Sequence, residues 1–155
     1  MANICPQAPN LNQQVWADLE DYARDLAAEG NELYILSGGY GNGGSGSNGG
    51  LTTSIAGGNI AVPARYWKVL LVLPFGEDDL TRIAPGWFSG TTRVIAVDMP
   101  NTQSANALEW YDYRTSVDAI EDSTRAMRRC LDVLNALGTE LQGLLEVGVD
   151  AGPVN

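Results

Sequence analysis

A short, unbroken apolar run, Val69–Phe75, sets the first condition on the fold. It is far shorter than the ~20 apolar residues that cross a bilayer, and it has the length of a buried strand. Together with the residues before it, the run predicts a strand from Tyr66 to Leu73 that lies in the centre of a sheet and is buried on both faces. Other elements must therefore pack on both sides of this strand.

The size and composition of the chain indicate one globular domain. It has 155 residues, of which 45% are hydrophobic and 18% are charged, a composition typical of folded proteins. A chain of this length builds one core but not two. We expect a single domain over residues 1–147 and a frayed tail over residues 148–155. No basic segment or apolar region that would indicate a signal peptide follows Met1, and the localisation stays open.

A long helix is predicted after the turn Pro6–Pro9. Asn10 is suited to cap its start, and Gly30 ends it. The apolar residues that recur at helical spacing are Leu11, Val15, Leu19, Tyr22, Ala23 and Leu26. This spacing indicates one buried face.

The remaining chain predicts mainly strands, followed by helices. Besides residues 66–73, the predicted strands are residues 32–37, 59–62 and 92–99, with a short strand or extended segment at 110–114. Residues 38–50 are mostly glycine and predict a flexible surface loop. Thr115–Asp118 has capping-box chemistry and starts one or two helices that reach Leu145. We therefore predict an α+β fold with a mostly antiparallel central sheet flanked by helices.

Charge and cysteine content limit the kinds of site. The net charge is −10, with 19 acidic and 9 basic residues, which excludes the broad cationic face that supplies most sequence-independent nucleic-acid affinity. Lys68 is the only lysine, and the chain contains no histidine. Cys5 and Cys130 can form one disulfide or stay as two thiols, and their spacing does not fit a zinc site.

Four residues on the predicted helix share one flank, because Asn12, Trp16, Glu20 and Arg24 lie four residues apart. An amide oxygen and a carboxylate suit a hydrated magnesium ion, which takes oxygen ligands and keeps several waters. Asn12 and Glu20 lie about 12 Å apart along the axis at ~1.5 Å per residue, too far to share one ion easily as direct ligands. Structural alternatives are a backbone hydrogen bond for Asn12, packing for Trp16 and an exposed ion pair between Glu20 and Arg24.

A set of ordered motifs carries a family resemblance. The N-terminal pattern is N-I-x-P-Q-x(4)-N-x(3)-W-x(2)-L-E, and it begins at Asn3. The segments that follow in order are Leu36–Gly38, Val62–Val69, Met99–Asn101 and Tyr113–Glu121. This set resembles the DNA/RNA non-specific endonuclease family, which consists of sugar-non-specific nucleases of ββα-metal architecture.

The chain departs from the family pattern in three places. The Asp-Arg-Gly-His segment that carries the family's general base is absent. Thr124–Arg125 stands where the family usually has Thr-Gly, and the glycine-rich loop is longer than expected. The resemblance therefore implies a ββα-metal nuclease-like fold whose first strands are missing, so that an apolar strand edge is left uncovered.

The resemblance also implies roles for residues of the first helix. Asn12 corresponds to the family's direct metal ligand, for Mg²⁺ or Mn²⁺, and Glu20 to a carboxylate that acts through a metal-bound water. Arg24 corresponds to an arginine that holds a phosphate, and Asn3 has two readings, as a support for the turn or as a support for Asn12. The catalytic residues in this chain would then be Glu20 and Arg24, with no general base.

Three functions follow as hypotheses. The first is metal-dependent hydrolysis of DNA and RNA by a truncated or base-less endonuclease, weak or inactive alone. The second is a non-enzymatic remnant that binds protein or nucleic acid. The third is one half of a split nuclease, completed by a chain or segment that carries the histidine hairpin. The expected partner is the DNA or RNA backbone, no membrane is involved, and the uncovered edge would favour homo-oligomers.

Overall fold

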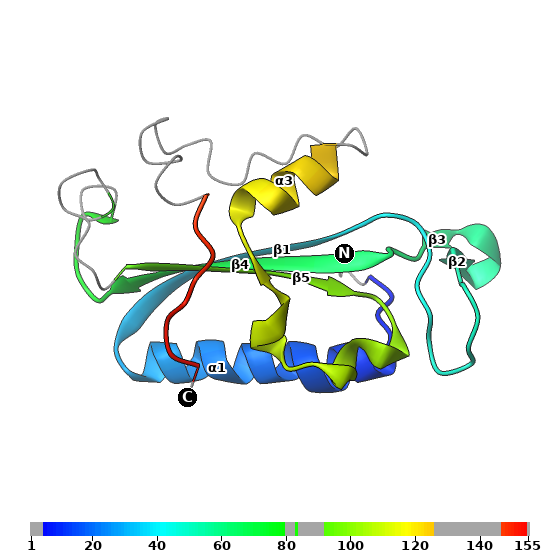
Figure 1. Ribbon diagram of the computed structural model, residues 1–155, viewed down its shortest axis with the longest axis horizontal. Coiled ribbons are helices and arrows are strands. Elements are labelled where there is room, and N and C mark those ends of the chain that lie inside the picture. The colour runs from blue at the N-terminus through cyan, green and yellow to red at the C-terminus, as the bar shows by residue number, and fades with distance from the viewer. Residues whose placement is uncertain (1–4, 80–82, 84–91, 126–146, 155) are drawn as a thin grey trace.

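The computed structural model describes residues 5–79, 83, 92–125 and 147–154. Within them, one antiparallel sheet has the strand order β1-β4-β5-β6, and β2 and β3 form a separate ribbon (Figure 1). The strands are β1 (Asn31–Tyr40), β2 (Ser54–Ile55), β3 (Ile60–Ala61), β4 (Arg65–Pro74), β5 (Arg93–Pro100) and β6 (Arg114–Thr115). The helices and helical turns are η1 (Leu11–Val15), α1 (Trp16–Ala28), η2 (Ala56–Gly58), η3 (Gln103–Ala107), η4 (Trp110–Tyr113) and α3 (Val117–Arg125). The predicted α+β fold with a mostly antiparallel sheet is confirmed.

Strand β4 is the centre of the sheet, as the apolar run predicts. It pairs with β1 on one side and with β5 on the other, so that Lys68 lies between Ser37 and Val97. Every residue from Tyr66 to Leu73 is buried. This burial requires a covering layer on each face of the sheet.

Helix α1 covers one of these faces, with η1 as its π-helical first turn (Figure 1). The apolar stripe of the helix packs into the larger core cluster, which includes Leu11, Leu19, Leu26, Leu70, Val72 and Ile95. The expected cap is wrong, because the Asn10 side chain makes no capping hydrogen bond at the helix start. Its backbone N–H and its side-chain amide instead donate to Gln103 of η3, at 3.0 and 2.9 Å.

Helix α3 covers the opposite face of the sheet (Figure 1). Val117 and Ile120 pack there against Trp67 and Val69 of β4. The predicted start is confirmed, since the Ser116 hydroxyl accepts a hydrogen bond from the Ala119 N–H at 3.2 Å. The predicted helices beyond Arg125 and as far as residue 145 lie outside the described residues.

Two predicted segments differ in the structure. Trp110 to Tyr113 form the 3-10 turn η4 rather than a strand, because the buried Trp110 ring packs on Tyr22 of α1 with 4.9 Å between ring centroids. The glycine-rich segment begins within β1, since Gly38 continues the strand. A Cβ at Gly38 would lie 2.9 Å from the Trp67 ring, so the glycine leaves room for this ring over β1.

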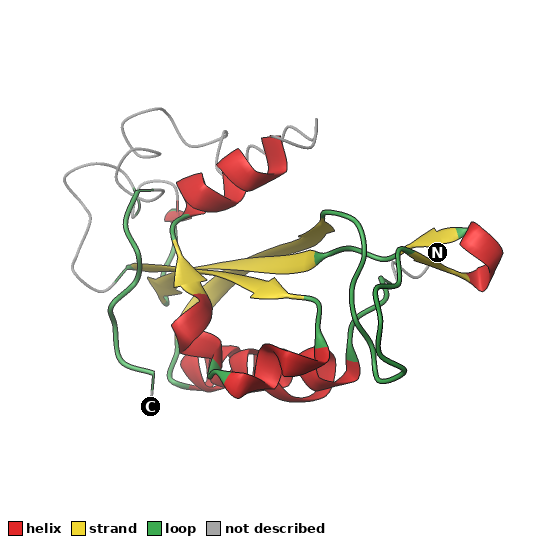
Figure 2. Cartoon of the chain, turned by 45° about the vertical axis from the view of Figure 1, so that its right-hand side comes forward, coloured by secondary structure: helices red, strands yellow, loops and turns green. Residues whose placement is uncertain are grey.

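The C-terminal segment crosses from the α3 side of the sheet to α1 (Figure 2). Asp150 forms ion pairs with Arg93 at 2.8 Å and with Arg114 at 3.3 Å, and the Pro153 carbonyl accepts a hydrogen bond from Tyr22. The partly buried Arg93 and Arg114, together with Tyr22, thus hold residues 150–153 against the sheet and α1. In the described part of the chain, no helix is long and apolar enough to cross a membrane.

Candidate active site

The structure places Trp16, Glu20 and Arg24 of the polar stripe on the flank of α1 that faces β4 and β1. Asn12 lies in η1, and Glu20 and Arg24 lie in α1; all three are exposed. Trp16, between them, is 8% exposed and packs edge-on against Tyr66 of β4. Packing is therefore the role of Trp16, while the other three side chains reach solvent.

Glu20 and Arg24 do not pair with each other. The Glu20 carboxylate accepts a hydrogen bond from the Lys68 ammonium at 2.9 Å. Arg24 pairs with Asp21, one turn back on the same helix. The exposed ion pair between Glu20 and Arg24 that the sequence offered as an alternative is therefore not formed, because Glu20 pairs with the buried Lys68 instead.

Lys68 lies within the motif segment Val62–Val69, but the motif alone does not indicate a role for it in this site. It is 4% exposed, and its ammonium lies 4.2 Å from the centroid of the Trp16 ring. Burial lowers the pKa of the Lys68 ammonium, and the hydrogen bond and charge of Glu20 oppose this shift. The signal in the sequence is a single lysine within an apolar strand, whose burial requires an anionic partner.

A cavity of about 390 Å³ lies beside this ion pair, between α1 and β1. Glu20, Arg24 and Lys68 supply its charged wall, and Ile35 and Ser37 of β1 line the other side. Because β1 is the outermost described strand of the sheet, this cavity opens along the sheet edge. Glu20 and Arg24 are thus brought to one cavity, whereas Asn12 lies nearer the start of the helix.

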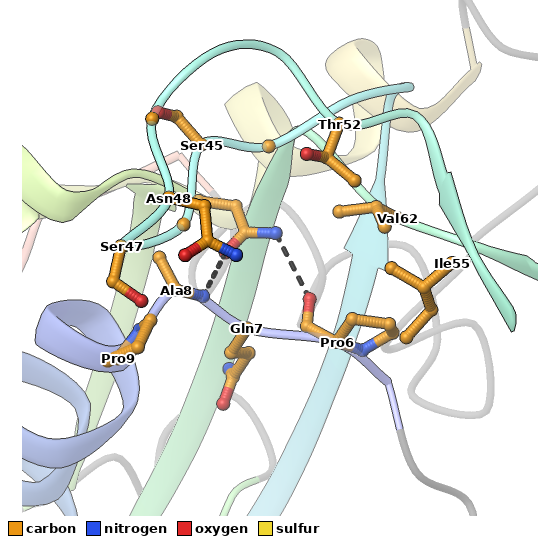
Figure 3. Close-up of a pocket in the computed structure, with 14 residues that line it drawn as sticks. Pro6, Gln7, Ala8, Pro9, Ser45, Ser47, Asn48, Thr52, Ile55 and Val62 are labelled. Carbon is orange, nitrogen blue, oxygen red and sulfur yellow. Dashed lines mark hydrogen bonds between the residues drawn. The ribbon is translucent and has the colours of Figure 1, made fainter.

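The start of this helix is anchored by Asn101, the end of the Met99–Asn101 motif. The side chain of Asn101 is fully buried; its oxygen accepts from the Ala8 N–H at 2.7 Å, and its amide donates to the Pro6 carbonyl at 3.1 Å (Figure 3). The same amide also donates to the Pro63 carbonyl at 2.7 Å. Asn12 follows one turn later, with its N–H bonded to the Ala8 carbonyl at 2.9 Å. Asn101 therefore fixes the segment from which Asn12 projects.

A second cavity of about 230 Å³ lies between this segment and the glycine-rich loop (Figure 3). Ser45, Ser47, Asn48 and Thr52 provide its polar groups, and Pro6 lies opposite them. These groups are all neutral, so they offer neither a carboxylate that would bind a metal ion nor a cation that would bind phosphate.

Metal binding in this structure would depend on few protein ligands. Among the described residues, no group of three or more His, Cys, Asp or Glu side chains is placed to hold a metal. The exposed Asn12 amide fits a different arrangement, in which one protein oxygen binds a cation that keeps most of its waters. Asn3 and Cys130 lie outside the described residues, and Cys5 is exposed.

The fold is shared with EndoG in the structure of the EndoG/EndoGI complex. The TM-score is 0.54 at 20% sequence identity, and the match covers 79% of this chain and 46% of EndoG. The described part of the chain therefore shares its overall fold with EndoG.

Sequence comparison gives the family. A model of the DNA/RNA non-specific endonuclease family matches residues 1–136. A nuclease of Nostoc sp. is 35% identical over 150 residues, which is 97% of this chain and 47% of the relative. Mitochondrial endonuclease G of Bos taurus is 26% identical over 124 residues, 78% of this chain and 37% of the relative. The chain belongs to the DNA/RNA non-specific endonuclease family, and it spans less than half the length of these relatives.

Proposed function

We propose that this chain forms the metal-binding part of an endonuclease that uses a divalent cation to hydrolyse phosphodiester bonds of DNA and RNA. The observation that carries the proposal is the flank of the first helix, where the Asn12 amide is exposed and Glu20 is held by Lys68 further along. Membership of the endonuclease family supports the same function.

The oxygen donors on this flank suit a hard cation such as Mg²⁺ or Mn²⁺. The Asn12 amide oxygen would be the direct protein ligand, and the Glu20 carboxylate would accept a hydrogen bond from a water bound to the ion. The Arg24 guanidinium, whose side chain is 67% exposed, would contact a phosphate of the substrate. The bound cation would stabilise the charge on the leaving oxygen.

The general base would come from another segment. The chain has no histidine, and carboxylates with ordinary pKa values are weak bases for water at pH 7. Loss of a positioned general base costs about 10²–10⁴-fold in rate. We therefore expect weak or no cleavage by the chain alone, and completion by a segment or second chain that carries an Asp-Arg-Gly-His hairpin.

Strand β1 is the place where such a hairpin would add to the sheet. It is the outermost described strand on its side, and it exposes the apolar side chains of Ile35 by 51% and Leu36 by 37%. An apolar edge strand favours pairing with a further strand. A hairpin added there would also lie beside the cavity that Glu20 and Arg24 line.

The test is to restore cleavage. The purified chain is mixed with the hairpin, or fused to it ahead of Met1, and incubated with supercoiled plasmid or RNA and Mg²⁺. We expect negligible cleavage by the chain alone, and metal-dependent cleavage with the hairpin that is lost on chelation and in Asn12→Ala. A hairpin with alanine in place of its histidine is the matched control.

Two results would contradict parts of this proposal. Metal-dependent nicking by the chain alone, lost in Asn12→Ala, would show that a carboxylate serves as the base. If the hairpin changes neither oligomeric state nor cleavage, the chain is a non-enzymatic binding domain.

A further inference from the structure

Lys68 joins the central strand of the sheet to the flank of the helix that carries Glu20. Its backbone lies in the middle of β4, paired on both sides by β1 and β5. Its side chain is only 6% exposed, whereas the Glu20 side chain is 46% exposed. The ion pair therefore connects a fixed, buried cation to a carboxylate that reaches solvent.

Trp16 limits the movement of the ammonium on a second side. The Lys68 Nζ lies 4.2 Å from the centroid of the Trp16 ring, which is the geometry of a cation–π interaction. The Trp16 ring packs in turn against Tyr66, two residues earlier on the same face of β4, at 6.1 Å between centroids. Packing thus sets the position of Lys68, unlike that of a surface lysine.

The ion pair uses one of the two carboxylate oxygens of Glu20. Lys68 Nζ donates to Oε1 at 2.9 Å, and no donor among the described residues bonds to Oε2. An ionised carboxylate accepts several hydrogen bonds, so Oε2 keeps its capacity to accept one from water. The result is a held carboxylate that presents one oxygen to solvent.

We propose that Lys68 is a positioning residue of the endonuclease site, which holds Glu20 so that its second oxygen accepts a hydrogen bond from a water of the divalent cation at Asn12. This inference rests on the metal role proposed above for Asn12 and Glu20. Lys68 itself contacts neither the cation nor the substrate and acts through Glu20. Outer partners of this kind typically contribute 10–100-fold to metal affinity.

The test uses the full chain and four variants: Lys68→Met, Glu20→Gln, the double variant, and Arg65→Met. Arg65 is the matched control, because it is also a basic residue of β4 and its ion pair with Asp98, at 2.9 Å, lies away from Glu20. Mn²⁺ affinity is measured by water-proton relaxation, and folding is checked by urea unfolding. We expect about tenfold weaker Mn²⁺ binding in Lys68→Met, and none of this loss in Arg65→Met.

The double variant separates positioning from general destabilisation. If Lys68 acts through Glu20, the double variant binds Mn²⁺ as Glu20→Gln does. Additive losses of Mn²⁺ affinity in the double variant, or wild-type Mn²⁺ affinity in Lys68→Met, would overturn the inference. The metal site itself is tested separately by Asn12→Ala. If Lys68→Met fails to fold, Trp16→Phe takes its place. This variant weakens the contact that holds the Lys68 ammonium and should also reduce Mn²⁺ affinity.

A second readout needs no metal. Carbon relaxation of the Glu20 side chain should report restricted motion in the wild type and in Arg65→Met, and fast motion in Lys68→Met. Equal motion in all three would overturn the inference. A wild type that binds no Mn²⁺ would overturn the proposed metal function, and the Glu20 relaxation would then decide whether Lys68 holds this carboxylate.

Discussion

Asp150 holds the C-terminal segment against the sheet. Its carboxylate accepts hydrogen bonds from Arg93 at 2.8 and 3.0 Å and from Arg114 at 3.3 Å, and its side chain is 6% exposed. Burial alone would raise the pKa of the Asp150 carboxyl, but the two arginines outweigh burial and hold the pKa below its usual value. A lowered pKa in the folded state means that ionisation of Asp150 stabilises the fold.

At pH 7, Asp150→Asn should lower the free energy of unfolding by roughly 3 kcal/mol, because two largely buried arginines lose their counter-charge. In the wild type this contribution is present above the unfolded-state pKa of about 4, and it is lost as the pH falls through the lower folded-state pKa. The stabilities of the two proteins should therefore converge in acid. Urea unfolding at pH 7 and at several values below pH 4 measures this.

The control for Asp150 is Asp122→Asn, since Asp122 lies 3.4 Å from the exposed Arg125. This exposed pair should contribute little. A difference between wild type and Asp150→Asn that stays constant at all pH values would show that the charge of Asp150 is not what stabilises the segment.

At the level of elements, regular apolar spacing made part of the fold predictable. The helix before Gly30 follows from apolar residues at helical spacing, and the strand from Tyr66 to Leu73 follows from a short apolar run that is buried on both faces. The turn at Trp110 could not be predicted, because it depends on the distant Tyr22. The stripe from Asn12 to Arg24 was visible in the sequence for the same local reason, whereas the pairing of Lys68 with Glu20 depends on which strand lies against the helix.

The anchor formed by Asn101 gives a prediction about the first helix. Asn101→Asp keeps the acceptor for the Ala8 N–H but removes the donors to Pro6 and Pro63, and it buries a carboxylate next to two carbonyls. We expect a loss of roughly 2–4 kcal/mol in the free energy of unfolding. Asn106→Asp should have a small effect, because the Asn106 amide donates only one exposed hydrogen bond to Gln14, at 2.9 Å. Equal stability of both variants would contradict the role of Asn101 as an anchor.

At the scale of the whole molecule, the described residues leave one edge of the sheet poorly protected. Leu36 and Ile35 of β1 are exposed on opposite faces of the outermost described strand. The net charge of −10 favours solubility. Strand β1, however, contains no lysine or proline, the residues that commonly prevent pairing of an edge strand. A single substitution on β1 should therefore change the association of the whole chain.

We predict that the chain alone self-associates through β1, and that Leu36→Lys suppresses this association, because a lysine on an edge strand opposes pairing with a second strand. The matched control is Leu108→Lys, since Leu108 is also an exposed leucine, at 50%, but lies outside the sheet. Sedimentation equilibrium of the three proteins over a range of concentrations gives the association constants. We expect at least a tenfold weaker constant in Leu36→Lys, equivalent to about 1.4 kcal/mol, and a wild-type value in Leu108→Lys. A monomeric wild type, or equal effects of both lysines, would mean that the exposed edge of β1 does not recruit a second strand.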